Sequence, residues 1–383
     1  MVKSKTAQLI AALSFLTPAG ARAAGLNALP NLALYERYVA IDGSCSWPRL
    51  TLLPGGEISA LIWPHPNHGL VAGAAECWNS TDGGRTWHRI GVPVPNASAD
   101  NRMNVAAGLA SDGAYTALVA GWTHCPPGRW SATTDEERKH RSQFHRPPST
   151  TSRAIPAVSR DGGRTWSQYG EVADLPQSSR HLTPYGPIRP LSGARMGVML
   201  YGETAYFFAS ADQGRTWGKL GQLGSAGDYN ETSWIILANR DFYAAARSSD
   251  DHGLDGFRST DGGATWLKER SLTLPLQHPG DLVRLQDGRI LLTYGVRNEG
   301  LWAICVRFGD PTARLWSAPL CLVDLEGSTD EPRSPDPLRD GGYPSTVVLA
   351  DGTLVTAYYS RGVSAHTRYH MGVIRWRPPD AHS

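Results

Sequence analysis

The stretch Ser80–Trp87, with the sequence STDGGRTW, recurs along the chain and decides the fold. Further copies are SRDGGRTW at 159–166, SADQGRTW at 210–217 and STDGGATW at 259–266, and a worn fifth copy spans 308–316. Their aspartates stand 79, 51, 49 and 49 residues apart. A repeat period near fifty residues is typical of the blades of a β-propeller.

Each copy has the composition of a tight hairpin turn. Asp and Ser side chains hydrogen-bond to turn amides, and Gly supplies a position with positive φ. The Thr then opens the next strand, and the Trp can pack against a neighbouring blade. Each copy therefore predicts a turn between two strands.

A second pattern allows the blades to be counted. It consists of an apolar run, a turn with Gly and another apolar run, as at 50–63, 282–294 and 347–359. The remaining slots are filled by the segments 106–110, 188–199 and 235–246. The pattern predicts an all-β fold, a six-bladed β-propeller of four-stranded blades. A strand at 35–41 beside 371–376 would close the ring and remove its exposed edges.

The composition limits the function classes. The 383 residues contain 37 Lys and Arg against 35 Asp and Glu, and 41% are hydrophobic. This balance is typical of a soluble globular protein and lacks the basic excess of a nucleic-acid-binding one. The five cysteines form no CxxC pair, and neither a metal-ligand spacing nor a phosphate loop is present. We therefore expect no metal, no cofactor and no nucleic-acid partner.

The N-terminus has the three parts of a secretory signal. Lys3 and Lys5 precede the apolar run 7–16, and Ala21-Arg22-Ala23 offers a cleavage site. No later stretch is long enough to span a membrane. We expect a signal peptide at 1–23 and a single propeller domain at 24–383, secreted or periplasmic and monomeric. A loop insertion at 125–150 should overhang the active face.

Propeller topology indicates where chemistry should gather. The first strand of each blade begins, and the second strand ends, on the same face, so polar residues at these positions converge on the central axis. The candidates at that rim are His68, Arg102, His181, Tyr185, Glu231, Arg247, His278, Arg297 and Tyr343.

The octapeptides resemble the Asp boxes of the sialidase (neuraminidase) superfamily, and the resemblance covers nearly all of the mature chain. It implies that the boxes are structural turns between the third and fourth strands, on the face away from the active site. Glu231 and Arg247 have a spacing usual for the family's Glu and its second carboxylate-binding Arg. Tyr343 stands where the family has its nucleophilic Tyr, and Arg297 suits the third Arg. Asp boxes also occur in propellers without enzymatic activity.

The first blade departs from the family pattern. Ser46-Trp47-Pro48 stands where an Arg-Ile-Pro is usual, and Arg49 should turn away from the site. The family's acid/base Asp is missing from the loop 63–69. Arg102 is the predicted replacement cation. His68 or His65 is the predicted acid/base, because His titrates near neutral pH.

These residues predict a secreted enzyme that hydrolyses a terminal acidic sugar from a glycan. Tyr343 would be the nucleophile, Glu231 its activating base and His68 the acid/base. The predicted substrate-binding residues are Arg102, Arg247, Arg297, His181, Tyr185 and His278. One alternative is a polysaccharide lyase acting at a uronic acid, with Arg neutralising the carboxylate and His or Tyr moving protons. The other is a non-catalytic propeller that binds glycans.

Overall fold

The structure is a computed structural model that describes residues 32–67, 69, 71–97, 100–122, 151–175, 181–298, 301–325, 340–363 and 366–380. The predicted signal peptide, the insertion at 125–150 and His68 lie outside these residues.

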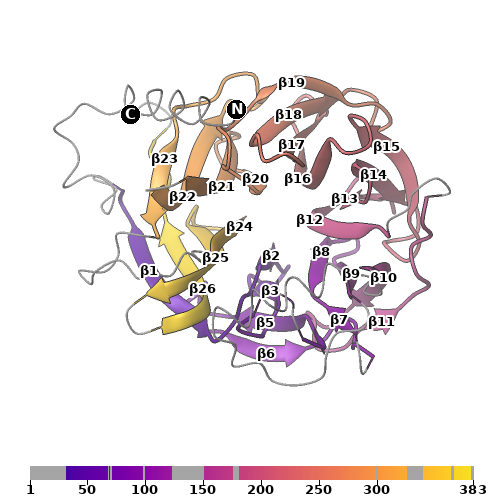
Figure 1. The fold of residues 1–383 in the computed structure, drawn as a ribbon, viewed down its shortest axis with the longest axis horizontal. Coiled ribbons are helices and arrows are strands. Elements are labelled where there is room, and N and C mark those ends of the chain that lie inside the picture. The colour runs from indigo at the N-terminus through magenta and orange to yellow at the C-terminus, as the bar shows by residue number, and fades with distance from the viewer. Residues whose placement is uncertain are drawn as a thin grey trace, which may run out of the picture.

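The described residues form six four-stranded antiparallel blades around a central axis, which confirms the predicted propeller (Figure 1). The first blade contains β2 (Arg49–Leu52), β3 (Ile58–Ile62), β5 (Glu76–Ser80) and β6 (His88–Gly91). The second contains β8 (Asn104–Leu109), β9 (Tyr115–Trp122), β10 (Thr151–Ser159) and β11 (Ser167–Gln168). The third contains β12 (Thr183–Pro190), β13 (Met196–Tyr201), β14 (Ala205–Ser210) and β15 (Gly218–Leu223).

The other three blades complete the ring. The fourth contains β16 (Tyr229–Ile236), β17 (Phe242–Ser248), β18 (Leu254–Ser259) and β19 (Leu267–Ser271). The fifth contains β20 (Gly280–Arg284), β21 (Ile290–Asn298), β22 (Leu301–Gly309) and β23 (Leu320–Asp324). The sixth contains β24 (Gly341–Val348), β25 (Leu354–Val363), β26 (His366–Trp376) and β1 (Tyr35–Asp42). A small parallel sheet joins β4 (Gly73–Ala74) to β7 (Asn101–Arg102).

The ring closes by pairing the two ends of the chain. Strand β1 lies antiparallel to β26, with a register that runs from Tyr35 opposite Trp376 to Asp42 opposite His370. The predicted closing strand is therefore confirmed. Strand β1 covers the outer edge of β26, so strand pairing joins the last blade to the start of the chain.

The repeated octapeptides form the predicted turns between the third and fourth strands. In the first copy the Ser80 hydroxyl accepts a hydrogen bond from the Gly84 amide, 2.8 Å away. Asp82 accepts bonds from the amides of Arg85 and Thr86, and the Trp87 indole donates to the Gly84 carbonyl. The same pattern recurs in the other full copies, and the worn fifth copy forms a related turn around Asp310.

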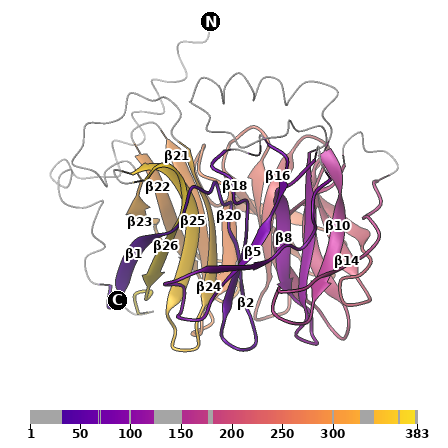
Figure 2. The same ribbon diagram turned by 90° about the horizontal axis from the view of Figure 1, so that it is seen from below.

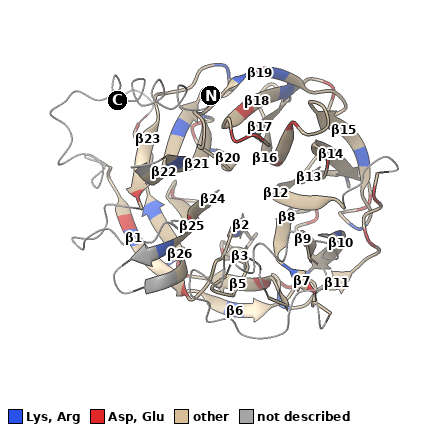
Figure 3. Cartoon of the chain, viewed as in Figure 1, with Lys and Arg blue, Asp and Glu red and all other residues tan. Residues whose placement is uncertain are grey.

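Aromatic and aliphatic side chains pack between neighbouring blades. Phe207 of the third blade lies with its ring centroid 4.9 Å from that of Trp234 in the fourth. Side views show the strands running between two faces of a disc (Figure 2). Basic and acidic residues are distributed around the ring (Figure 3). No helix in the described part of the chain is long and apolar enough to cross a membrane.

Candidate active site

Four candidate residues occupy equivalent positions at one end of the strands. Glu231 and Tyr343 are each the third residue of an inner strand, β16 and β24. Arg247 and Arg297 are each the next-to-last residue of a second strand, β17 and β21. Because the strands of a blade alternate in direction, this end is opposite the turns between third and fourth strands. The four side chains therefore gather on the face away from the Asp boxes.

Tyr343 and Glu231 form the shortest contact of this group. The Tyr343 hydroxyl donates to Glu231 Oε1 at 2.5 Å. Tyr343 has a backbone φ of +48°, in the left-handed region that non-glycine residues seldom adopt. Such strain persists only where the surrounding structure holds it, and it is enriched at functional sites.

The environment keeps the phenol of Tyr343 protonated at neutral pH. Burial raises the pKa of Tyr343, and the negative charge of Glu231 raises it further, against the opposing effect of Arg247 and Arg297. A phenolate therefore forms only when the proton passes to an acceptor, and Glu231 is in place to take it.

Arg247 is held between two carboxylates. Its Nη1 lies 2.7 Å from Glu231 Oε2 and 3.5 Å from the Tyr343 hydroxyl, and its Nη2 lies 2.8 Å from Asp251 Oδ1. Burial opposes the charge of Arg247, but the negative charge of Glu231 and the other contacts outweigh it and raise the pKa of Arg247. The guanidinium is thus permanently charged beside the reactive oxygen.

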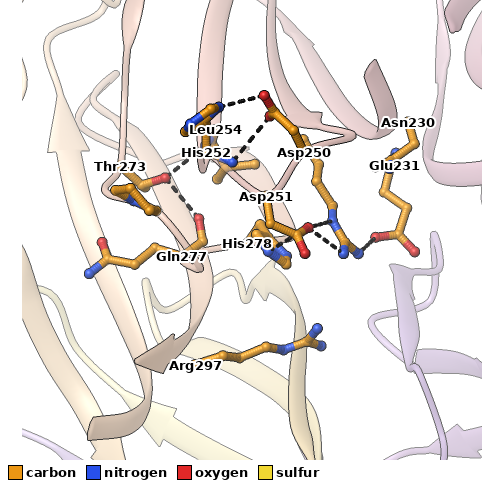
Figure 4. Close-up of polar contacts among 12 residues, drawn as sticks. Asn230, Glu231, Asp250, Asp251, His252, Leu254, Thr273, Gln277, His278 and Arg297 are labelled. Atoms are coloured by element: carbon orange, nitrogen blue, oxygen red, sulfur yellow. Dashed lines mark hydrogen bonds and ion pairs between the residues drawn. The ribbon is translucent and has the colours of Figure 1, made fainter. Parts of the chain in front are cut away.

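Arg297 approaches the same tyrosine from another side. Its guanidinium carbon lies 5.3 Å from the centroid of the Tyr343 ring, and its Nε donates to the Gly341 carbonyl at 3.2 Å. Its Nη2 is buried and has no hydrogen-bond partner among the described residues. In Figure 4, Arg297 lies below Asp251 and His278 and extends toward the side on which Glu231 lies. A buried donor without a partner is suited to an anionic group of a ligand.

Aromatic rings surround Tyr343. Tyr185 and Trp47 each lie with their ring centroids 6.2 Å from that of Tyr343, and Tyr359 lies 5.7 Å from it. In the Ser46-Trp47-Pro48 stretch of the first blade, it is therefore the aromatic side chain of Trp47 that contacts the tyrosine. This arrangement makes that side of the cluster apolar.

His278 contacts the cluster through Asp251, a residue that the sequence analysis did not single out. Its Nε2 lies 3.1 Å from Oδ1 of Asp251. Burial, together with the charges of Arg247 and Arg297, lowers the pKa of His278 to about 3, so the imidazole is neutral at neutral pH. Asp251 belongs to the acidic pair Asp250-Asp251 in the turn after β17, four residues beyond Arg247. This position near Arg247 is the feature of the sequence that could have indicated its role.

Comparison with known proteins assigns the chain to a family. A sequence profile of the BNR repeat-like domain matches residues 139–356. The chain belongs to the BNR repeat-like domain family. No curated protein matches the chain significantly.

Solved structures share the fold. A protein of unknown function from Dyadobacter fermentans superposes with a TM-score of 0.69 at 19% identity, covering 91% of this chain and 100% of that one. A Hadza microbial sialidase superposes with a TM-score of 0.60 at 17% identity, covering 88% of this chain and 66% of that one. The intramolecular trans-sialidase from Ruminococcus gnavus superposes with a TM-score of 0.62 at 15% identity, covering 89% of this chain and 96% of that one. The chain therefore shares the propeller fold of these sialidases.

Two other predicted residues of this BNR-repeat protein have recorded ion pairs outside the cluster. His181 pairs with Asp174 at 2.8 Å, and the nearest recorded acidic partner of Arg102 is Asp100 at 3.7 Å. The structure records no contact of either residue with Glu231 or Tyr343, so their substrate-binding roles stay predictions. Arg49 pairs with Asp281 at 2.8 Å.

The remaining candidates concern the proton donor and metals. His68 lies outside the described residues and stays a prediction. The ring of His65 packs against Trp63, with 4.8 Å between the centroids. Within the described ranges no group of three or more His, Cys, Asp or Glu side chains could hold a metal ion.

Proposed function

We propose that this protein is a secreted glycoside hydrolase that removes a terminal acidic sugar from a glycan. The observation that carries the proposal is the hydrogen bond from the Tyr343 hydroxyl to Glu231, with Arg247 beside both oxygens. Sialidases and an intramolecular trans-sialidase are among the proteins that share its fold, which supports the same class of substrate.

The chemistry follows from the geometry in two displacements. As the Tyr343 oxygen bonds to the anomeric carbon, its proton passes to Glu231 and the bond from that carbon to the leaving oxygen breaks. The leaving oxygen takes a proton from an acid, for which His68 remains our predicted donor. Water then attacks the anomeric carbon and gives one proton back to the predicted donor His68, while Tyr343 leaves and its oxygen takes back the proton held by Glu231. Two displacements retain the anomeric configuration.

The two arginines have different tasks in this scheme. Arg247 lies 3.5 Å from the Tyr343 hydroxyl and stabilises negative charge as it develops there. Arg297 keeps an unpartnered Nη2 and is the group we assign to the carboxylate of the sugar. Trp47 and Tyr185 would contact the apolar faces of the sugar.

The first test is a screen of acidic glycans and of 4-methylumbelliferyl glycosides of acidic sugars. Wild-type protein should release a free sugar, and Tyr343→Phe should lose hydrolysis while keeping its fold by circular dichroism. Glu231→Gln should reduce turnover about 100- to 10,000-fold, as expected for a lost general base. Activity that survives in Tyr343→Phe would contradict the proposed nucleophile.

The same screen separates the alternatives. A lyase acting at a uronic acid would release an unsaturated product that absorbs in the near ultraviolet, whereas a hydrolase would not. A binding propeller would retain glycans without converting them. Either result would replace the proposal.

A further inference from the structure

Asp251 is held in an unusual backbone conformation beside the proposed active site. It lies between β17 and β18 with a φ of +60°. Its amide donates to the Ser248 carbonyl at 3.2 Å, and its own carbonyl accepts from the Leu276 amide at 2.9 Å. These two backbone bonds fix the conformation from neighbouring loops. Strain retained in this way indicates a role for the side chain that the backbone presents.

The side chain of Asp251 holds Arg247 from the side away from Glu231. Its Oδ1 lies 2.8 Å from Nη2 and 3.3 Å from Nε of Arg247. The opposite edge of the same guanidinium contacts Glu231 at 2.7 Å. In Figure 4 the carboxylates of Asp251 and Glu231 lie on either side of the guanidinium to which both bond. Two partners on opposite edges leave the planar guanidinium little freedom to rotate.

This arrangement bears on the proton transfer from Tyr343. A guanidinium with Glu231 as its single partner could turn a second N–H toward that carboxylate and compete with the phenol for Oε1. Its whole positive charge would also fall on the group that must accept the proton. Asp251 occupies the second edge of the guanidinium and offsets part of its charge.

The other groups facing Arg247 do not supply this balance. His278 is neutral at neutral pH, as described above, and Arg297 is a cation. Tyr343 carries no charge until it gives up its proton. We propose that Asp251 is a positioning residue, which orients Arg247 toward the pair formed by Tyr343 and Glu231 and balances its charge. This inference rests on the proposed function.

The decisive variant is Asp251→Gly. Glycine adopts positive φ freely, so the substitution removes the carboxylate while relieving the backbone strain. Asp250→Asn is the matched control, because the neighbouring Asp250 pairs with the exposed His252 and not with Arg247. Asp251→Asn tests charge separately, since Asn keeps the shape and tolerates left-handed backbone.

The measurements are kcat and KM for 4-methylumbelliferyl α-sialoside, together with the unfolding temperature. For Asp251→Gly we expect kcat to fall about 10- to 100-fold, the effect of a misplaced catalytic group, with KM changed less. The unfolding temperature should stay the same or rise. Asp251→Asn should also lose turnover, and Asp250→Asn should match the wild type. Unchanged kcat in Asp251→Gly, or a loss that only follows a fall in unfolding temperature, would overturn the inference.

Tyr343→Phe in the same assay separates the two proposals. If it is inactive while Asp251→Gly is fully active, the inference about Asp251 is wrong and the proposed function stands. If it remains active, or if the wild type cleaves neither this probe nor any other acidic-sugar glycoside of the screen, the proposed function is at fault. A crystal structure of Asp251→Gly then decides about Asp251 without any substrate. Arg247 turned away from its present contact with Glu231 would support the inference, and an unmoved Arg247 would overturn it.

Discussion

Backbone strain gathers at single residues around Tyr343. Trp47, Asp251 and Tyr343 have φ values of +39°, +60° and +48°, although none is a glycine. Each such residue costs on the order of 1–3 kcal/mol, which the rest of the fold must offset. All three lie in contact with Tyr343 or with its neighbour Arg247. The other non-glycine residues with positive φ, Gln213, Arg240, Leu276 and Ala313, lie in other turns, so part of the backbone strain of the described residues coincides with the candidate chemistry.

His278 should make the stability of the protein depend on pH. Its pKa is lowered to about 3 by burial and by Arg247 and Arg297, against the weaker opposing effect of Asp251. The unfolded state binds a proton near pH 6.5 and the folded state does not, so stability is present above that pH and is lost as pH falls toward about 3. Between about pH 7 and pH 4.5 this costs about 2–3 kcal/mol.

The test compares urea unfolding of the wild type and His278→Gln at these two pH values. Glutamine is polar but cannot titrate, so on acidification the free energy of unfolding of the variant should fall by about 2–3 kcal/mol less than that of the wild type. His252→Gln, at an exposed histidine, is the control and should behave as the wild type. Equal losses in the wild type and His278→Gln would contradict the prediction.

The Asp-box turn also joins one blade to the next. In the fourth blade, Gly262 and Gly263 have φ values of +73° and +98°. A Cβ on Gly262 would meet open space, whereas a Cβ on Gly263 would come within 2.4 Å of the Phe207 ring in the third blade. The second glycine of the box is therefore needed for close packing between blades as well as for the turn.

Two neighbouring substitutions separate these requirements. Gly262→Ala should lower the free energy of unfolding by about 1–2 kcal/mol, the cost of left-handed backbone for an L-residue. Gly263→Ala carries the same cost and also overpacks the contact with Phe207, so we expect a further loss of about 1–3 kcal/mol. Denaturant unfolding measures both variants. Equal stability of the two would show that the contact with Phe207 yields without cost.

At the scale of the whole molecule, Asp281 connects four blades near the axis. It lies on β20 of the fifth blade, and its Oδ1 accepts from Arg49 of the first blade and from the Ser233 hydroxyl of the fourth. Its Oδ2 accepts from the amide of Thr346 in the sixth blade. The inner strands are thereby held at one spacing, which sets how far apart Glu231 and Tyr343 stand.

Loss of this carboxylate should weaken the entire ring. Asp281→Ala leaves the charge of Arg49 buried without its partner, which typically costs about 3–5 kcal/mol. Asp287→Ala, in the exposed turn after β20, is the control and should cost about 1 kcal/mol or less. Calorimetry of both variants measures the difference. An Asp281→Ala protein as stable as the Asp287→Ala control would show that the axial network contributes little.

The sequence by itself determined the blades and the rim. The octapeptide turns, the paired apolar runs and the closing strand are local patterns, because a turn or a strand depends on a few adjacent residues. Together with propeller topology they placed Glu231, Arg247, Arg297 and Tyr343 at one end of the strands. That reasoning did not indicate the partner of His181, which is Asp174.

Only the tertiary structure decided which of those side chains meet. The contact of Tyr343 with Glu231 joins residues 112 positions apart, and its length depends on the radius of the whole ring. Asp251 reaches Arg247 only because backbone bonds to Ser248 and Leu276 hold it in a left-handed conformation. No local pattern encodes such contacts, since they arise from the packing of blades against one another and from loops fixed by that packing.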